Sequence, residues 1–286
     1  MTMTTEELLR QLKTKQIVIF GAGFVAEMFY RALELHGAEG SLCFCAVTRA
    51  GSGQRFHGRP VLSLSETDIR EDMLVCLAVH ESAEDSLRET LRPYEAQTVR
   101  IYPHLFELLY GAPVRYEAAL PLAALLARQD REEYWLVVRY AAVRDYLAGG
   151  RDYPRSRELY LRSLELHCGE KTALRRVSQM EALASSVAEE GFRSDRPVRI
   201  DEAGRVIDGL HRIACAACLR IETIPALVYP VSPVFDRIFE EKNRLPQRTL
   251  RAAGFGEEDM RFLRACAEEL FSPASGGPAP ERSRQK

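Results

Sequence analysis

Several features that mark particular classes of protein are missing from this sequence. The longest hydrophobic runs, such as residues 120–127 and 213–219, are much shorter than the roughly 20 apolar residues that span a bilayer. Neither sign of charge is in clear excess, because 39 Lys and Arg stand against 41 Asp and Glu for a net charge of −2. We therefore expect no membrane association, and no protein whose whole surface binds nucleic acid.

A secretion signal and a disulfide framework are also missing. Residues 1–11 are polar and contain no apolar stretch after a basic start, so they do not have the pattern of a secretory signal. The 7 cysteines are odd in number and scattered. Cys43, Cys45 and Cys76 stand in apolar runs, where a free thiol packs as a small hydrophobe. We expect a reduced, cytoplasmic protein without a metal site.

The composition that remains is that of a globular protein. The chain has 286 residues, enough for about two domains, with 46% hydrophobic and 28% charged residues. The fold class predicted is α/β. We expect a Rossmann-like parallel-sheet domain at 1–112, a helical connector at 113–171 and a smaller α+β domain at 172–271. The Pro-, Gly- and Ser-rich tail at 272–286 is expected to be disordered.

A glycine turn near the N-terminus connects a predicted strand to a predicted helix. Residues 16–20 (QIVIF) are a short β-branched run, and a helix is predicted at 27–36. Between them lies Gly-x-Gly-x-x-Ala, in which Gly21 permits a tight turn and Gly23 lets the backbone approach a phosphate. Ala26 lets the helix pack closely on the strand, and the helix N-terminus then presents amides to an anion.

Further strands are predicted at 42–47, 73–79 and 99–102, with a helix at 82–91. Strands that alternate with helices indicate a parallel sheet. In a dinucleotide fold an acidic residue at the end of the second strand holds the ribose. Thr48-Arg49 occupies that position here. This leaves two readings open: either Arg49 accepts the 2′-phosphate of NADP, or the domain does not bind NAD.

The glycine turn and the Gly-x-Pro-Val stretch within residues 56–62 support a family resemblance. Residues 16–105 resemble the Rossmann-like N-terminal domain of sugar O- and N-acyltransferases of the PglD type. The resemblance implies a nucleotide-sugar as the ligand of this domain, with NAD(P) as a further option. The alternative is a Rossmann-like domain retained for packing or assembly.

The connector at 113–171 shows no strand signal. Helices are predicted at 134–147 and 156–167, the second with Ser156 as its N-cap. The single tryptophan, Trp135, is interpreted as a core anchor.

The second half contains a motif typical of phosphate binding. A helix is predicted at 180–190, followed by short strands, a helix from residue 208 to 219, and a strand at 223–229. The motif Asp-Gly-x-His-Arg opens the second of these helices. Gly209 permits the sharp turn. His211 and Arg212 place positive groups beside the helix N-terminus, where the helix dipole makes a cation unfavourable, and an anionic ligand would offset this repulsion. The adjacent Asp208 is a candidate base or partner of a metal-bound phosphate.

Residues 177–230 resemble the ParB/sulfiredoxin superfamily. The stretches LASSVAEEGF and PVRIDEAGRVIDGLHRIACAACLRIETIPALVY match its order of helix, strand pair, glycine-led helix start and final strand. The resemblance implies that these elements bind the phosphates of a nucleotide. It makes His211 and Arg212 phosphate contacts, Ser186 the helix hydroxyl that joins them, and Gly209 the turn glycine.

Departures from the family restrict the activity. Sulfiredoxin has Cys where this chain has Leu210, so sulfinic-acid reduction is not expected. The chromosome-partitioning members carry Glu-Arg-Arg and a following helix-turn-helix, for which little chain remains. The motif is more similar to the Asp-Gly-His-His-Arg of the free-serine kinase branch, whose Asp activates a substrate hydroxyl. The upstream Glu of that branch has no assigned counterpart, although Glu181 is near in sequence.

These observations predict a nucleotide-binding protein that uses ATP, ADP or CTP, with Mg²⁺, to phosphorylate a small molecule, with Asp208 and His211 as catalytic residues. One alternative is a binding module that senses a nucleotide or nucleotide-sugar without turnover. A second alternative is a ParB-like nucleic-acid-associated protein, which the net charge of −2 disfavours. Arg175 and Arg176 are interpreted as surface charge, with anion steering as the alternative. The oligomeric state stays open.

Overall fold

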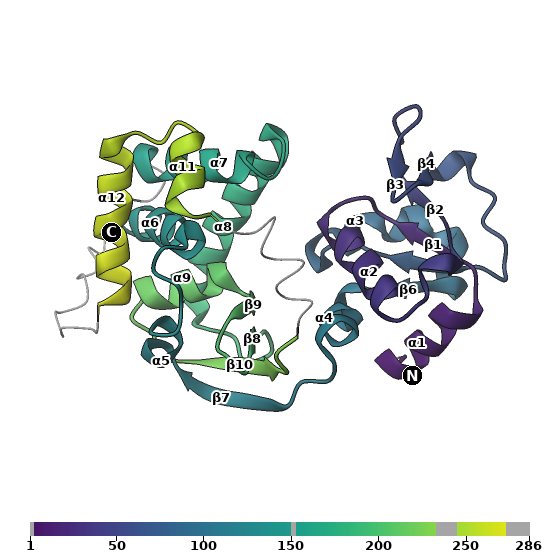
Figure 1. Cartoon of the computed structure of the whole chain (residues 1–286), viewed down its shortest axis with the longest axis horizontal. Helices are drawn as coiled ribbons and strands as arrows, with labels where there is room; N and C mark the ends of the chain where they lie inside the picture. Colours follow the sequence, from purple (N-terminus) through teal and green to yellow (C-terminus); the bar gives the residue numbers. More distant parts are fainter. Residues whose placement is uncertain (1–2, 150–152, 233–244, 273–286) are drawn as a thin grey trace. The chain divides into compact units, whose positions relative to one another are not determined.

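The computed structural model describes residues 3–149, 153–232 and 245–272. The chain divides into two compact units, Met1–Ala112 and Pro113–Lys286, and each is described here by itself (Figure 1). The tail expected to be disordered lies almost wholly outside the described residues.

The first unit contains a sheet of order β3-β4-β2-β1-β5-β6. Its strands are β1 (Ile17–Phe20), β2 (Leu42–Val47), β3 (Arg55–Phe56), β4 (Arg59–Ser63), β5 (Leu74–Leu77) and β6 (Thr98–Arg100). All neighbours pair in parallel except β3, which is antiparallel to β4 at the edge. Every residue of β1 is buried, as expected for a central strand covered on both faces. The predicted α/β class with a parallel sheet is confirmed.

Helices of the first unit are α1 (Thr5–Thr14), α2 (Phe24–Leu35), α3 (Glu81–Leu91) and α4 (Tyr102–Tyr110), with short 3-10 turns at Glu39–Ser41, Leu64–Glu66 and Arg92–Gln97. The strand predicted at 99–102 was placed too far along the chain. It ends at Arg100, and Tyr102 begins α4, because Pro103 fits the first turn of a helix and the apolar residues after it repeat at helical spacing.

The second unit contains a mixed sheet of order β7-β10-β8-β9. Its strands are β7 (Arg115–Pro121), β8 (Val198–Asp201), β9 (Val206–Asp208) and β10 (Thr223–Tyr229). The expectation that 113–171 contains no strand is wrong, because β7 pairs antiparallel with β10. Most residues of β7 are exposed, so this edge strand lacks the alternating hydrophobic pattern that sequence analysis relies on. Its backbone pairing with β10 holds it in the sheet.

Helices of the second unit are α5 (Leu122–Leu126), α6 (Tyr134–Gly149), α7 (Pro154–Glu165), α8 (Glu170–Glu190), α9 (Leu210–Cys218), α11 (Gln247–Ala252) and α12 (Glu257–Phe271). Ser156 is not an N-cap. Helix α7 begins two residues earlier, at Pro154, whose fixed φ suits a first helical position, and Ser156 is buried inside the helix.

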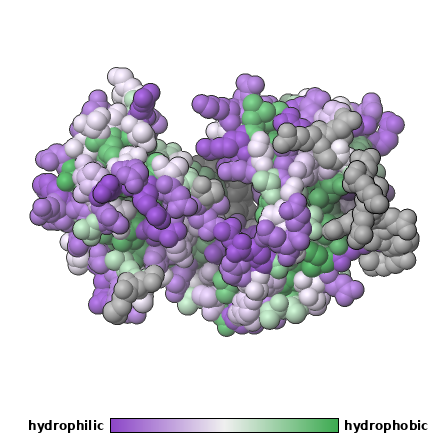
Figure 2. Space-filling view, turned by 180° about the vertical axis from the view of Figure 1, so that it is seen from behind, coloured by the Kyte–Doolittle hydropathy of each residue, from purple (hydrophilic) through white to green (hydrophobic). Residues whose placement is uncertain are grey.

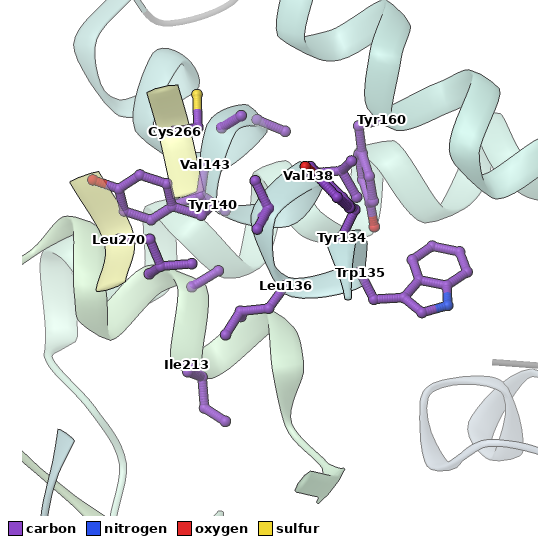
Figure 3. Close-up of a cluster of buried hydrophobic side chains, with 14 of the residues drawn as sticks. Tyr134, Trp135, Leu136, Val138, Tyr140, Val143, Tyr160, Ile213, Cys266 and Leu270 are labelled. Carbon is purple, nitrogen blue, oxygen red and sulfur yellow. The ribbon is translucent and has the colours of Figure 1, made fainter. Parts of the chain in front are cut away.

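The predicted connector and the motif-bearing segment share one hydrophobic core. Figure 3 shows Leu136 and Val143 of α6 in this core, together with Ile213 of α9 and Leu270 of α12. Helix α6 also packs on α7 and α8. The helices of 113–171 are therefore part of the second unit and bring their side chains to the start of α9.

Hydrophilic residues cover much of the face seen in Figure 2. The large hydrophobic side chains that are exposed are distributed over several elements and loops, with two of them on α2: Phe24, Leu35, Val114, Tyr116, Leu166, Leu174 and Val231. No helix within the described residues has the length and apolar character needed to cross a membrane.

Candidate anion-binding site

The Asp-Gly-x-His-Arg motif lies where the sequence placed it, at a strand-to-helix junction. Strand β9 ends at Asp208, and Gly209 adopts φ 109° and ψ 15° before α9 begins. A Cβ on Gly209 would lie 2.8 Å from Cγ1 of Val198, so this position needs glycine for both its conformation and its surroundings. As at every helix N-terminus, the first amides of α9 lack an acceptor within the helix.

Asp208 and Arg212 are partners of one another in the structure. Oδ2 of Asp208 accepts hydrogen bonds from Nη2 of Arg212 at 2.9 Å and from Nη1 of Arg199 at 3.0 Å. Nη1 of Arg212 donates to the carbonyl oxygens of Arg196 and Pro197. Arg212 therefore ties the start of α9 to the β8–β9 edge, and the carboxylate of Asp208 lies between two guanidinium groups.

The side chain of His211 contacts α6 and α7, which belong to the segment predicted as a connector. Its Nε2 lies 2.5 Å from the hydroxyl of Tyr160 and 3.3 Å from Nε of Arg139. A guanidinium stays protonated in proteins, so the Arg139 Nε–H donates and Nε2 of His211 accepts. The Nε–H of Arg139 and the hydroxyl of Tyr160 thus hold the Nε2 side of the His211 ring.

Arg139 is the most unusual charged residue of the site. Its side chain is only 9% exposed, and its guanidinium lies 4.5 Å above the ring of Trp135, whose carbonyl oxygen accepts from Nη1 at 2.8 Å. Within the described part of the chain, no carboxylate pairs with Arg139 and its Nη2 group donates to no acceptor. Burial lowers the pKa of Arg139, and the nearby Arg176 lowers it further. A buried cation without a counter-ion is rare and costly, which points to an anion from outside.

Arg176 and His167 interact electrostatically with Arg139. Arg176 on α8 is half-buried, and His167 follows α7 with its ring 4.9 Å from that of Trp135. Burial lowers the pKa of His167, and the charges of Arg139 and Arg176 lower it further. Burial raises the pKa of Tyr160, with the same two arginines opposing that shift. We call Arg139, Tyr160, His167, Arg176 and His211 the basic cluster; its members come from α6, α7, α8, α9 and the residues after α7.

A further donor lies next to this cluster. The indole Nε1 of Trp135 is buried without a hydrogen-bond partner among the described residues. Figure 3 shows Trp135 and Tyr160 at one end of the core cluster, with Tyr140 and Leu270 at the other. Sequence analysis missed Arg139, Tyr160 and Trp135 as site residues. The usable signal was a lone arginine in an otherwise apolar helix, YWLVVRYAAV.

The sequence singled out two residues of α8, Ser186 and Glu181. Ser186 is half-buried on the helix that packs against α9, but it is the neighbouring Ser185 whose hydroxyl bonds with that of Tyr146, at 2.9 Å. Glu181 accepts hydrogen bonds from Tyr153 and from Nε of Arg157. Glu181 is therefore held by α7 and the residue before it.

The glycine turn of the first unit has the geometry that its sequence predicts. Gly21 has φ 120°, and a Cβ there would lie 2.7 Å from the carbonyl oxygen of Ala78. Gly23 is the N-cap of α2 and faces open space, whereas Ala26 is completely buried. The space in front of Gly23 is thus accessible to a ligand at the carboxyl end of β1, next to the point where the strand order reverses.

Within residues 3–149, 153–232 and 245–272, no three His, Cys, Asp or Glu side chains gather in a way that could hold a metal ion. No protein-family model matches the chain, and neither a curated protein nor a solved structure gives a significant match.

Proposed function

We propose that the second unit binds a nucleotide, with ATP, ADP or CTP as candidates, and that its phosphates lie at the start of α9 against the basic cluster. One observation carries the proposal: Arg139 is a buried guanidinium with a free Nη2 group and no carboxylate partner in the described chain, and it is hydrogen-bonded to His211 of the motif. Phosphate supplies the missing charge and matches the planar donor geometry of arginine. The resemblance of residues 177–230 to the ParB/sulfiredoxin superfamily supports the same ligand class.

A nucleotide titration tests the proposal. We expect ATP, ADP or CTP to raise the Tm of the wild-type chain, because a ligand at 100 times its Kd adds about 2.7 kcal/mol to the stability of the folded state. His211→Ala should reduce this shift, since it removes the acceptor that orients Arg139. The absence of a shift with every nucleotide up to millimolar concentration would overturn the proposal.

Phosphate transfer to a small hydroxylated acceptor is the second candidate, and the position of Asp208 at the end of β9, immediately before the start of α9, favours it. In that case Mg²⁺ would enter with the phosphates of the nucleotide and neutralise their charge, while Asp208 would accept the proton of the acceptor hydroxyl. Since two guanidinium groups hold its carboxylate, the geometry supports binding without turnover better.

Asp208→Asn separates these two candidates. If the unit is a binding module, we expect no nucleotide consumption by the wild type across a panel of small alcohols, and at most a modest loss of affinity in the variant. A product that forms with the wild type and falls at least about 100-fold with Asp208→Asn would establish transfer instead. Product release is followed by ³¹P NMR.

For the first unit we propose a ligand with a pyrophosphate group at the turn formed by Gly21 and Gly23. A nucleotide-sugar is the first candidate, from the resemblance of residues 16–105, and NAD(P) is the second. The open space at Gly23 and the buried Ala26 support this proposal.

A further inference from the structure

Strand β7 forms one edge of the sheet of the second unit (Figure 1). It pairs with β10 on its inner side, and none of the described strands pairs with it on its outer side. Most of its seven residues are exposed. Because an edge strand of this kind presents unpaired backbone groups, a further strand can add to it.

The side chains of β7 differ between the two faces of the sheet, since successive residues of a strand point to opposite sides. Arg115 and Glu117 share one face, where Nε of Arg115 lies 2.7 Å from Oε1 of Glu117. Tyr116 lies on the other face and is 51% exposed. The edge strand thus carries one charge of each sign on one face and an exposed aromatic ring on the other.

This charge pattern is complementary to a second copy of itself. When two antiparallel copies of β7 are centred on Tyr116, Arg115 of each copy lies opposite Glu117 of the other. Opposite charges in directly opposed positions are favourable and like charges are unfavourable. The same register places the two Tyr116 rings opposite one another on the second face, where their contact covers exposed apolar surface.

A bulge limits how far such a pairing extends. The register between β7 and β10 shifts after Glu117, where residues 118 and 119 of β7 stand opposite the single residue Pro225 of β10. A bulge bends its strand and interrupts regular pairing. The regular part of β7 is therefore Arg115–Glu117, and Tyr116 is its centre, which is the position that the charge pattern requires for the two-fold axis.

We propose that β7 pairs antiparallel with β7 of a second copy of this chain, with Arg115 and Glu117 as reciprocal ion pairs and Tyr116 at the two-fold axis. The contact uses the same surface of both copies, as in most homodimers, and joins two four-stranded sheets across the axis. Because the paired segment is short, we expect a weak dimer with a Kd of about 10 μM. The inference concerns a different surface from the candidate anion-binding site and does not depend on nucleotide binding.

Two single charge reversals test both the contact and its register. Arg115→Glu gives each copy two acidic residues at the contact, and Glu117→Arg gives each copy two basic residues. In sedimentation velocity of the full chain over micromolar concentrations, we expect the wild type to dimerise and each variant alone to dimerise at least about tenfold more weakly. An equimolar mixture of the two variants should dimerise within about threefold of the wild type, since every Glu then lies opposite an Arg of the other copy.

Arg193 and Asp195 provide the matched control. They form an exposed ion pair of the same spacing in the same unit, with Nη2 of Arg193 2.7 Å from Oδ2 of Asp195, and they lie outside β7. Arg193→Asp and Asp195→Arg should leave dimerisation unchanged, both alone and in a mixture. Circular dichroism checks that all four variants keep the secondary structure of the wild type.

Three results would overturn the inference: a wild-type chain that stays monomeric, a dimer that withstands both single reversals on β7, or a mixture of the two reversals that stays monomeric although both variants are folded. If a single variant fails to fold, two other variants decide. The double variant Arg115→Glu with Glu117→Arg keeps one charge of each sign and must dimerise like the wild type. Tyr116→Asp brings two like charges together at the axis and must not dimerise.

Discussion

Arg139→Met is expected to abolish stabilisation by nucleotides without lowering the stability of the ligand-free chain. The substitution removes a buried charge that has no counter-ion among the described residues, and replaces it with an apolar side chain of similar length. Exchanging buried charges for apolar groups is often neutral or stabilising, so we expect the free energy of unfolding to rise by zero to about 2 kcal/mol. Hydrogen bonds to charged groups contribute about 1.5–3 kcal/mol each, so losing two of them should weaken nucleotide binding at least about 100-fold.

Arg144 provides the control on the same helix. Its guanidinium pairs with Asp145 at 2.8 Å and with Glu269 at 2.6 Å, so it has the partners that Arg139 lacks. Arg144→Met should therefore lower the free energy of unfolding and leave nucleotide affinity unchanged. Urea denaturation with and without ADP measures both quantities. A large destabilisation by Arg139→Met, together with normal ADP binding, would show that Arg139 is a structural residue.

The second large effect is expected at the glycine turn of the first unit. Gly21→Ala forces an L-residue into φ 120° and brings its Cβ to 2.7 Å from the carbonyl oxygen of Ala78. Strained backbone of this kind costs about 1–3 kcal/mol, and the close contact with a backbone atom adds to this cost. We therefore expect the free energy of unfolding of the first unit to fall by at least about 3 kcal/mol. Gly23→Ala should cost less than about 1 kcal/mol, because its φ is −102° and its surroundings are open.

The position of Trp135 allows the affected unit to be identified. It is the only tryptophan of the chain and lies in the second unit, so its fluorescence reports on that unit alone. We expect Gly21→Ala to move the denaturation curve measured by circular dichroism and to leave the fluorescence curve in place. Gly23→Ala should move neither curve, yet prevent binding of a nucleotide-sugar to the first unit by filling the space of its phosphates. Equal stability of the two variants would contradict this account of the turn.

Elements with a strong hydrophobic pattern could be predicted from the sequence. The runs around Ile19 and Val75 are buried on both faces, the run around Phe44 is partly buried, and their apolar character alone identifies these strands. Strand β7 and the start of α4 could not be predicted in this way. The first is held by backbone pairing at a sheet edge, and the second depends on a proline that suits a helix start as well as a strand end.

The candidate site was predictable only where it is local in the chain. The turn at Gly209 and the position of His211 follow from the motif, because a strand, a glycine and a helix in succession fix the geometry. The partners of His211 come from residues 51 and 72 positions away, on helices whose packing no short motif encodes. Sequence reasoning therefore assigned the phosphate contacts to His211 and Arg212, while the structure pairs Arg212 with the carboxylate of Asp208 and gives Arg139 no carboxylate among the described residues.

A crystal structure of the full chain with ADP tests the central claim most directly. The account predicts a phosphate of ADP within hydrogen-bond distance, about 2.7–3.2 Å, of Nη2 of Arg139 and of an amide in the first turn of α9. It also predicts that the contact between Nε2 of His211 and Arg139 is kept in the complex. ADP bound with its phosphates away from α9, or an Arg139 that stays without an anion while ADP occupies another part of the second unit, would contradict the account.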